Sequence, residues 1–185
     1  MKPAAGERRA HSCDPRDVEW ERSAIVSERL RLEPLTIDHA VEMEAVLSST
    51  SLYEFTGENP PSLAELQERY ARQVTGRSAD GSQLWFNWVI RDPGSARAMG
   101  FVQATVSPNA GAMVAELAWL VGTRDQGNGF ATEAALAVRQ WLSSRDVVSF
   151  AASIHPEHGA SMAVARRLGL HRTDLLSGGE VIWQG

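Results

Sequence analysis

The fold of this chain is decided by the stretch from Val121 to Thr132, which reads VGTRDQGNGFAT. An apolar run, Ala115 to Val121, leads into the turn and predicts a strand, and a helical pattern, Phe130 to Ser144, leads out of it. Glycine permits backbone angles that other residues avoid and lets another molecule approach the main chain closely. A helix that begins after such a turn presents unpaired N–H groups and the positive end of its dipole. The stretch suits a phosphate or pyrophosphate cradle, although an ordinary βα turn fits the same spacing equally well.

Length and composition set the class of protein. A chain of 185 residues fits one domain with a proper core. Its net charge of −5 and pI of about 5.5 do not favour a nucleic-acid partner. Cys13 is the single cysteine, which excludes an intrachain disulfide and a cysteine cluster for a metal. We find neither an apolar run of about 20 residues nor a signal-peptide core, so we expect a cytoplasmic protein with no membrane partner.

The N-terminal half predicts a tail, a strand and two helices. Residues 1–23 are polar and aperiodic, so we expect a flexible tail in which only Trp20 might dock, and a single domain over 24–185. Ile25 to Pro34 alternates as a strand. Thr36 is placed to cap a helix that runs to about Ser49, with a buried stripe at Ala40, Met43 and Leu47.

A second helix and the loop before it follow. Ser62 and Glu65 form a capping box for a helix that runs to Gly76. The preceding loop, Ser51 to Pro61, is rich in aromatic and polar groups, and loops often carry function. Its candidate substrate contacts are Tyr53, Glu58 and Asn59. Plain loop surface explains the same residues equally well.

The C-terminal half predicts most of a sheet. Alternation and turn signals give three antiparallel strands, a parallel strand–helix–strand unit, a helix and a final hairpin; their ranges are 84–90, 99–106, 112–121, 130–144, 147–154, 158–168 and 170–184. The fold class is therefore α+β, with a mixed, mostly antiparallel central sheet flanked by helices.

At this point the sequence resembles the GNAT superfamily of acyl-CoA N-acyltransferases. Gln126 to Ala131, QGNGFA, fits the Gln/Arg-x-x-Gly-x-Gly/Ala signature, within the context AELAWLV before it and ATEA after it. Ile154 to Ser161, with Leu168-Gly169-Leu170, resembles the second CoA-facing segment of that family. Ser27 to Leu35 resembles the start of the branch that includes the ribosomal-protein N-terminal acetyltransferases.

The resemblance implies a binding mode for acetyl-CoA. Pyrophosphate would bind the N–H groups of the turn and the helix start, with a hydroxyl from the first helical turn; the residues are Gln126, Gly127, Asn128, Gly129, Phe130, Ala131 and Thr132. The strands 115–121 and 147–154 would splay apart. The pantetheine arm would then pair with main chain near Leu120 and Val121, as an added strand does. The spacing of the five histidines does not suit a metal site, so we expect none.

Glu116 is the candidate general base. In an alternating strand it shares a face with Ala118 and Leu120, and a carboxylate on a mostly apolar strand suits proton removal from an attacking amine. The alternative is a structural carboxylate that hydrogen-bonds to a neighbouring strand or loop.

The second segment departs from the family at two positions. His158 stands where many relatives have asparagine; it either donates to CoA through a ring nitrogen or is an exposed cap residue. Ser161 matches a family position that helps to hold the cofactor, or is a small residue at a helix contact. Ala165 stands where many relatives carry a tyrosine that protonates the leaving thiolate, although a thiolate with a pKa near 8.5 need not require a dedicated acid.

We therefore expect an acetyl-CoA-dependent N-acetyltransferase that acts on a small-molecule or peptide amine by direct attack. The alternative is a non-catalytic acyl-CoA-binding or sensing module. A nucleotide site is disfavoured, because the turn lacks a following Lys-Ser/Thr and is no G-x-G-x-x-G fingerprint. The acceptor stays unassigned, and a homodimer stays open.

Overall fold

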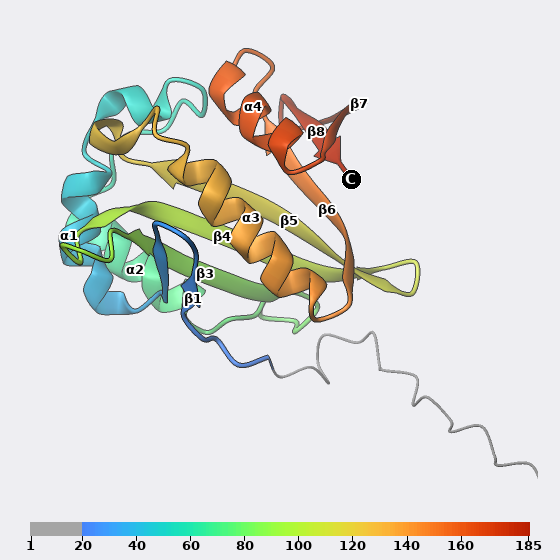
Figure 1. Ribbon diagram of the computed structural model, residues 1–185, viewed down its shortest axis with the longest axis horizontal. Helices are drawn as coiled ribbons and strands as arrows, with labels where there is room; N and C mark the ends of the chain where they lie inside the picture. The colour runs from blue at the N-terminus through green and yellow to red at the C-terminus, as the bar shows by residue number, and fades with distance from the viewer. Residues whose placement is uncertain (1–19) are drawn as a thin grey trace, which may run out of the picture.

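The computed structural model describes residues 20–185, and its centre is one eight-stranded sheet in the order β1-β2-β3-β4-β5-β6-β8-β7 (Figure 1). All neighbours are antiparallel except β5 and β6, which run parallel. This confirms the α+β class and the predicted mixed sheet. The strands are β1 Ile25–Val26, β2 Arg31–Pro34, β3 Leu84–Arg91, β4 Ala98–Asn109, β5 Ala112–Val121, β6 Val147–Ile154, β7 His171–Ser177 and β8 Glu180–Gln184.

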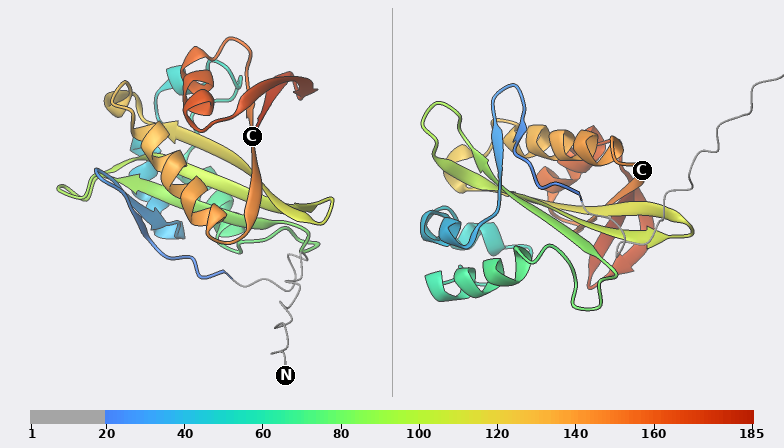
Figure 2. Two further views of the ribbon diagram at one scale, coloured as in Figure 1. Left: turned by 45° about the vertical axis from the view of Figure 1, so that its right-hand side comes forward. Right: turned by 90° about the horizontal axis from the view of Figure 1, so that it is seen from below.

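Helices cover both faces of the sheet (Figure 2). On one face the apolar stripes of α3 and α4 join the larger core cluster, which also holds Phe86, Leu117 and Phe150. On the other face α1 and α2 pack over a smaller cluster with Val89 and Ala98. The bounds are α1 Ala40–Val46, α2 Leu63–Gln73, α3 Phe130–Ser143 and α4 Gly159–Arg167, with short 3₁₀ turns at Ile37–His39, Thr50–Tyr53 and Thr123–Asp125.

Most local predictions are confirmed because their signals are local. Ser62 caps α2 and accepts from the Glu65 N–H at 3.4 Å, while the Ser62 N–H donates back to the Glu65 carboxylate at 2.8 Å. The predicted stripe of the first helix is buried, although that helix begins as a 3₁₀ turn and ends at Val46, before the expected Ser49.

The strand predicted over Ile25 to Pro34 is wrong in one respect, because the chain reverses within it. Ser27 N–H donates to the Leu30 carbonyl at 3.0 Å and closes a turn between β1 and β2. Leu30 and Leu32 are both buried, as the alternation predicts, but the segment forms two short strands and not one continuous strand. This turn places Ser27 and Arg29 against the start of α3.

The ordered domain reaches further toward the N-terminus than residue 24. Trp20 stacks on Phe86 with ring centroids 5.6 Å apart, so the predicted docking of this tryptophan is confirmed. Arg22 donates to the Val74 carbonyl at 2.9 Å, and the Trp88 indole donates to the Ser23 carbonyl at 3.2 Å. Residues 20–23 therefore belong with the domain. The rest of the predicted tail, with Cys13, lies outside the described residues.

Candidate active site

The parallel strands β5 and β6 separate partway along their length (Figure 1). They pair from Met113–Val147 to Glu116–Ala151, and β5 then continues to Val121 without a partner on that side among residues 20–185. From Ala151 to Ile154, β6 pairs instead with β8 on its other edge. The predicted splay is confirmed, and it leaves one edge of Leu117 to Val121 open to an extended ligand.

The glycine-rich turn at the end of β5 presents a row of free N–H groups. Gly127 and Gly129 both have φ of 79°, a left-handed conformation that favours glycine. Gly129 is the N-cap of α3, and the first hydrogen bond of the helix runs from Glu133 N–H to the Gly129 carbonyl at 3.0 Å. Within the described part of the chain, no main-chain N–H from Gln126 to Thr132 donates to another residue. A row of unpaired N–H groups at the start of a helix is an arrangement that suits an anion.

Side chains of the turn hold it in shape from behind. Gln126 Nε2 donates to the Val121 carbonyl at 2.9 Å, and Asn128 Nδ2 donates to the Asp125 carbonyl at 3.1 Å. Asp125 is itself buried and accepts two hydrogen bonds of 2.7 Å from the Arg97 guanidinium, which hold the pKa of Asp125 below its usual range. The side chains of Gln126 and Asn128 therefore set the shape of the turn, and the main chain is left to face a ligand.

A contact absent from the sequence predictions ties the cradle to the β1–β2 turn. Glu133, in the first turn of α3, accepts from Ser27 Oγ at 2.7 Å and from the N–H and Nε of Arg29 at 2.8 Å each. Arg29 also donates to the Asn128 carbonyl at 3.1 Å and lies over the Phe130 ring at 4.9 Å. Burial opposes ionisation of Glu133, but these hydrogen bonds outweigh it and lower its pKa.

Both partners lie in segments that the family resemblance had drawn attention to, Ser27 to Leu35 and the ATEA context of the turn. Arg29 and Glu133 are 104 residues apart in the sequence, so neither segment alone could reveal their hydrogen bond.

Glu116 lies at the last paired position before β5 and β6 separate. Its side chain is exposed, on the opposite side of the strand from the buried Ala115 and Leu117, so the predicted apolar surroundings are wrong. Ser153 Oγ donates to Glu116 Oε1 at 2.8 Å, the cross-strand bond that the structural alternative called for. The second carboxylate oxygen makes no hydrogen bond to any residue described here, so it is free to accept a proton.

His158 is the N-cap residue of α4, but its side chain makes no capping hydrogen bond. It is half-buried and stacks on Phe55 with ring centroids 4.4 Å apart, so the prediction of an exposed cap is wrong. Burial and the neighbouring His155 lower the pKa of His158. The contact links the loop between α1 and α2 to the start of α4. Ser161, one turn further, is half-buried.

The three loop residues predicted to contact substrate differ in their exposure. Tyr53 is buried and its hydroxyl donates to the Leu47 carbonyl at 3.0 Å, so its polar group is already engaged within the fold. Glu58 and Asn59 are exposed. Phe55, which the sequence reasoning did not single out, is the loop residue that reaches across to α4.

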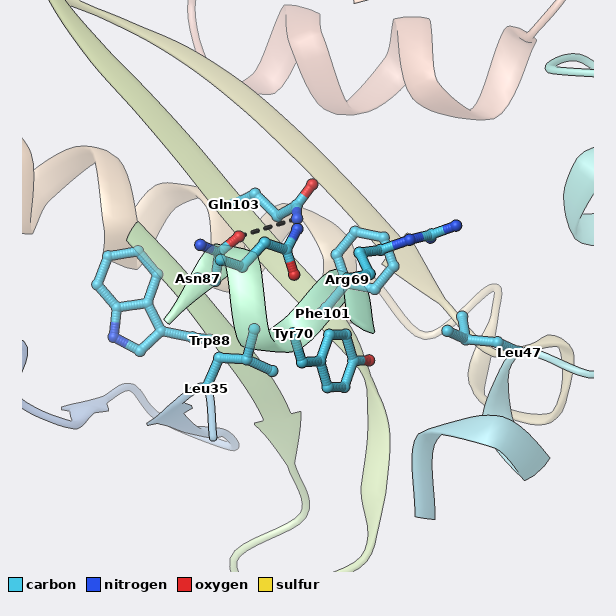
Figure 3. A pocket seen from close by; sticks show the side chains of 9 residues that line it. Leu35, Leu47, Arg69, Tyr70, Asn87, Trp88, Phe101 and Gln103 are labelled. Atoms are coloured by element: carbon cyan, nitrogen blue, oxygen red, sulfur yellow. Dashed lines mark hydrogen bonds between the residues drawn. The ribbon is translucent and has the colours of Figure 1, made fainter. Parts of the chain in front are cut away.

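A cavity of about 110 Å³ lies between α2 and the sheet (Figure 3). Its walls come from the segment after β2, from α1's end, from α2 and from strands β3 and β4; they are Leu35, Leu47, Arg69, Tyr70, Gln73, Asn87, Trp88, Phe101 and Gln103. Gln103 Nε2 donates to Asn87 Oδ1 at 2.9 Å within it. No residue of the second helix was among the candidate site residues from the sequence.

None of the helices between Trp20 and Gly185 is long and apolar enough to cross a membrane. Among the same residues, no three His, Cys, Asp or Glu side chains are grouped as a metal site would require.

Comparison with known proteins assigns the family. A family model described as an acetyltransferase (GNAT) domain matches residues 29–171. The chain therefore belongs to the GNAT family of acetyltransferases, which are enzymes of the acyltransferase class. No curated protein matches the sequence.

Solved structures share the fold at low sequence identity. A GNAT-family acetyltransferase from Bacillus anthracis has a TM-score of 0.71 at 16% identity, covering 88% of this chain and 98% of that one. RimL, a ribosomal L7/L12 alpha-N-protein acetyltransferase in complex with coenzyme A, has a TM-score of 0.71 at 16% identity, with 88% and 97% covered. An aminoglycoside acetyltransferase in complex with coenzyme A has a TM-score of 0.69 at 16% identity, with 84% and 94% covered.

Proposed function

We propose that the chain is an acetyl-CoA-dependent N-acetyltransferase that acetylates a primary amine, either of a protein N-terminus or of a small molecule. The observation that carries the proposal is that two features meet at one place. The open edge of β5 ends at a turn whose N–H groups, from Gln126 to Thr132, are unpaired. Two of the structural neighbours, RimL and the aminoglycoside acetyltransferase, are complexes with coenzyme A, which supports the same donor here.

In this proposal, different residues bind different parts of acetyl-CoA. The N–H groups of the turn hold the pyrophosphate, and charge-assisted hydrogen bonds of this kind contribute about 1.5–3 kcal/mol each. Main chain near Leu120 and Val121 pairs with the pantetheine arm. Thr132 adds a hydroxyl, and Ser161 and His158 face the donor from the other side of the splay.

The acetyl transfer then takes place where β5 and β6 separate. The thioester supplies the activated acetyl group. Glu116 accepts a proton from the incoming amine through the carboxylate oxygen that Ser153 does not hold. A main-chain N–H freed by the splay stabilises the charge that develops on the carbonyl oxygen. The methyl side chain of Ala165 supplies no acid, so water, Ser161 or another group protonates the leaving thiolate.

Isothermal titration with acetyl-CoA tests the donor site. In Gly129→Asp, the new carboxylate would stand against the pyrophosphate, and loss of two charge-assisted bonds predicts a dissociation constant about 100-fold higher. The nearest atom to a Cβ at this position is Arg29 Nη2 at 3.7 Å, so there is room for the side chain, and the φ of 79° adds backbone strain that a control must share. Gly178→Asp is a matched control, since Gly178 also has positive φ and lies in the open β7–β8 turn. Equal affinity in the two variants would refute the cradle.

Turnover separates the enzyme from a binding module. We expect thiol release from acetyl-CoA with some member of an amine library, and Glu116→Gln to lower kcat by about 100-fold or more. Glu68→Gln, an exposed change on α2, should leave kcat unaltered. Acetyl-CoA binding without turnover on any amine would favour the non-catalytic module, and an unchanged kcat in Glu116→Gln would remove the base role.

A further inference from the structure

Arg69, on α2, is a half-buried cation whose recorded counter-charge in the described structure, Glu65, acts on it only through space. Its guanidinium makes no hydrogen bond or ion pair there, whereas Arg97 holds Asp125 at 2.7 Å and Arg91 holds both Glu33 and Glu42. Glu65 lies one helical turn before Arg69, but its carboxylate is engaged by the Ser62 N–H and hydroxyl at 2.8 and 2.7 Å. A charge that is partly removed from water and left unpaired is costly unless a ligand pairs with it.

The surroundings of Arg69 suit an anion with a polar and an apolar part. Arg69 is the only charged residue that lines the cavity of about 110 Å³. Gln73, Asn87 and Gln103 supply amide groups, and burial raises the pKa of Tyr70 to about 12, which keeps that phenol neutral. In Figure 3 the Arg69 side chain extends away from the bonded Asn87–Gln103 pair. The volume suits one ligand group, such as the end of an acidic side chain.

The strand register relates this cavity to the reacting centre. Asn87 pairs with Gln103, and Gln103 pairs with Ala118, two residues from Glu116 on the same strand. Side chains two residues apart share a face of the sheet. The cavity and Glu116 therefore lie on one face. They are separated by one to two strand spacings across the sheet and by two residues along the strand, roughly 8–12 Å in all.

We propose that this cavity binds a carboxylate of the acceptor, so that the enzyme selects amines that carry an anion roughly 8–12 Å from the reacting nitrogen. The inference rests on the proposed function for the position of the amine. Arg69 pairs with the carboxylate, and the amine is directed across β4 toward Glu116 on β5. The same positive charge repels polycationic amines, so a multiply charged aminoglycoside is a poor acceptor.

Matched acceptors that differ only in charge test this selection. Two series are compared as free acids and as carboxamides: ω-amino acids of increasing length, and short peptides with one aspartate or asparagine at successive positions. The wild-type enzyme should prefer the acid in kcat/KM by about 10- to 100-fold at the best spacing. The series that reaches the higher value shows whether the carboxylate belongs to a small molecule or a peptide.

Two variants on one helix supply the control. Arg69→Gln should bring the acid-to-amide ratio close to one, while Arg72→Gln, an exposed change one turn away, should keep the wild-type ratio. Arg69→Lys should restore part of the preference, since the positive charge returns. Equal ratios in wild type and Arg69→Gln, with turnover retained, would overturn the anion site and leave acetyl transfer standing.

A binding measurement distinguishes failure of the site from failure of the proposed function. Calorimetry compares the acid and amide forms on the protein, with no turnover required. Acid binding that depends on Arg69, in a protein that acetylates no amine, would support the anion site and remove the proposed activity. Equal binding of acid and amide would overturn the anion site whatever the turnover.

Discussion

Replacing Glu133 by alanine should loosen the cradle without touching any group that faces the donor. Glu133 accepts hydrogen bonds from Ser27 Oγ, from the Arg29 N–H and from Arg29 Nε, at 2.7, 2.8 and 2.8 Å. Its side chain is 16% exposed, although the bonds from Arg29 lie at the surface. Glu133→Ala removes the acceptor from two donors. The part-buried Ser27 hydroxyl keeps only a long contact of 3.4 Å with the Leu30 carbonyl, and the exposed Arg29 N–H turns to water.

The magnitude follows from those groups. Each of these two lost hydrogen bonds costs about 0.5–1 kcal/mol. The guanidinium of Arg29 is 49% exposed, so its ion pair contributes at most about 1 kcal/mol. The total is about 1–3 kcal/mol, which corresponds to a fall in Tm of roughly 3–9 °C for a domain of this size. Because Arg29 also holds the Asn128 carbonyl, we expect acetyl-CoA affinity to fall about 10-fold, the equivalent of one weakened hydrogen bond.

Urea unfolding and calorimetry measure the two effects in one set of proteins. Glu28→Ala is the control, because Glu28 is an exposed carboxylate beside Arg29 and should change stability by less than about 0.5 kcal/mol. Combining Glu133→Ala with Arg29→Ala should cost less than the sum of the single changes, by about 1 kcal/mol. A Glu133→Ala protein as stable as the control would refute the reasoning.

Acidity gives an independent check on the same contact. The folded state holds the pKa of Glu133 below its usual 4.5, so its ionised form stabilises the folded state above that pH. This stabilisation is lost as the pH falls through the folded pKa. The difference in unfolding free energy between wild type and Glu133→Ala should therefore narrow below about pH 4.5, and a constant difference would contradict the assignment.

Three further predictions concern buried polar groups. Asp125→Asn should remove the charge that its arginine partner pairs with and lower the free energy of unfolding by about 2 kcal/mol, measured in urea. Tyr53→Phe should cost about 1 kcal/mol because the Leu47 carbonyl loses its donor; a raised acceptor KM at unchanged stability would instead restore the substrate role. Burial, aided by the charge of Arg91, lowers the pKa of His39 from 6.5, so the unfolded state takes up a proton first and stability should fall as the pH drops below about 6.5. A His39→Gln protein with the same pH dependence as wild type would contradict this last point.

The sequence predicted those parts of the fold that depend on local rules. The Gly127–Gly129 turn, the Ser62 capping box and the alternation of β3 to β5 each rest on neighbours a few residues apart, and all three are confirmed. The splay was also anticipated, but from family resemblance, because no residue pattern announces where two parallel strands cease to pair.

The missed features all join distant segments. Phe55 meets His158 only because the loop between α1 and α2 folds over the start of α4. Arg69 becomes informative only when Ser62 is seen to donate to Glu65, and when Arg69 is seen as the one charged residue that lines the cavity. Glu116 was placed correctly on its strand, yet its exposure depends on which face the helices leave uncovered, and the alternation of apolar residues does not encode that.

Because β5 and β6 separate, the stability of the folded chain depends on whether a ligand lies between these two strands. A ligand that hydrogen-bonds along Leu117 to Val121 binds the folded chain and not the unfolded one, and at a concentration of 100 times its Kd it adds about 2.7 kcal/mol to the free energy of unfolding. Amide hydrogen exchange of these five residues would slow as the ligand concentration rises. Resistance to proteases and heat would then rise and fall with the supply of the donor, so that the abundance of the enzyme follows the metabolite it consumes.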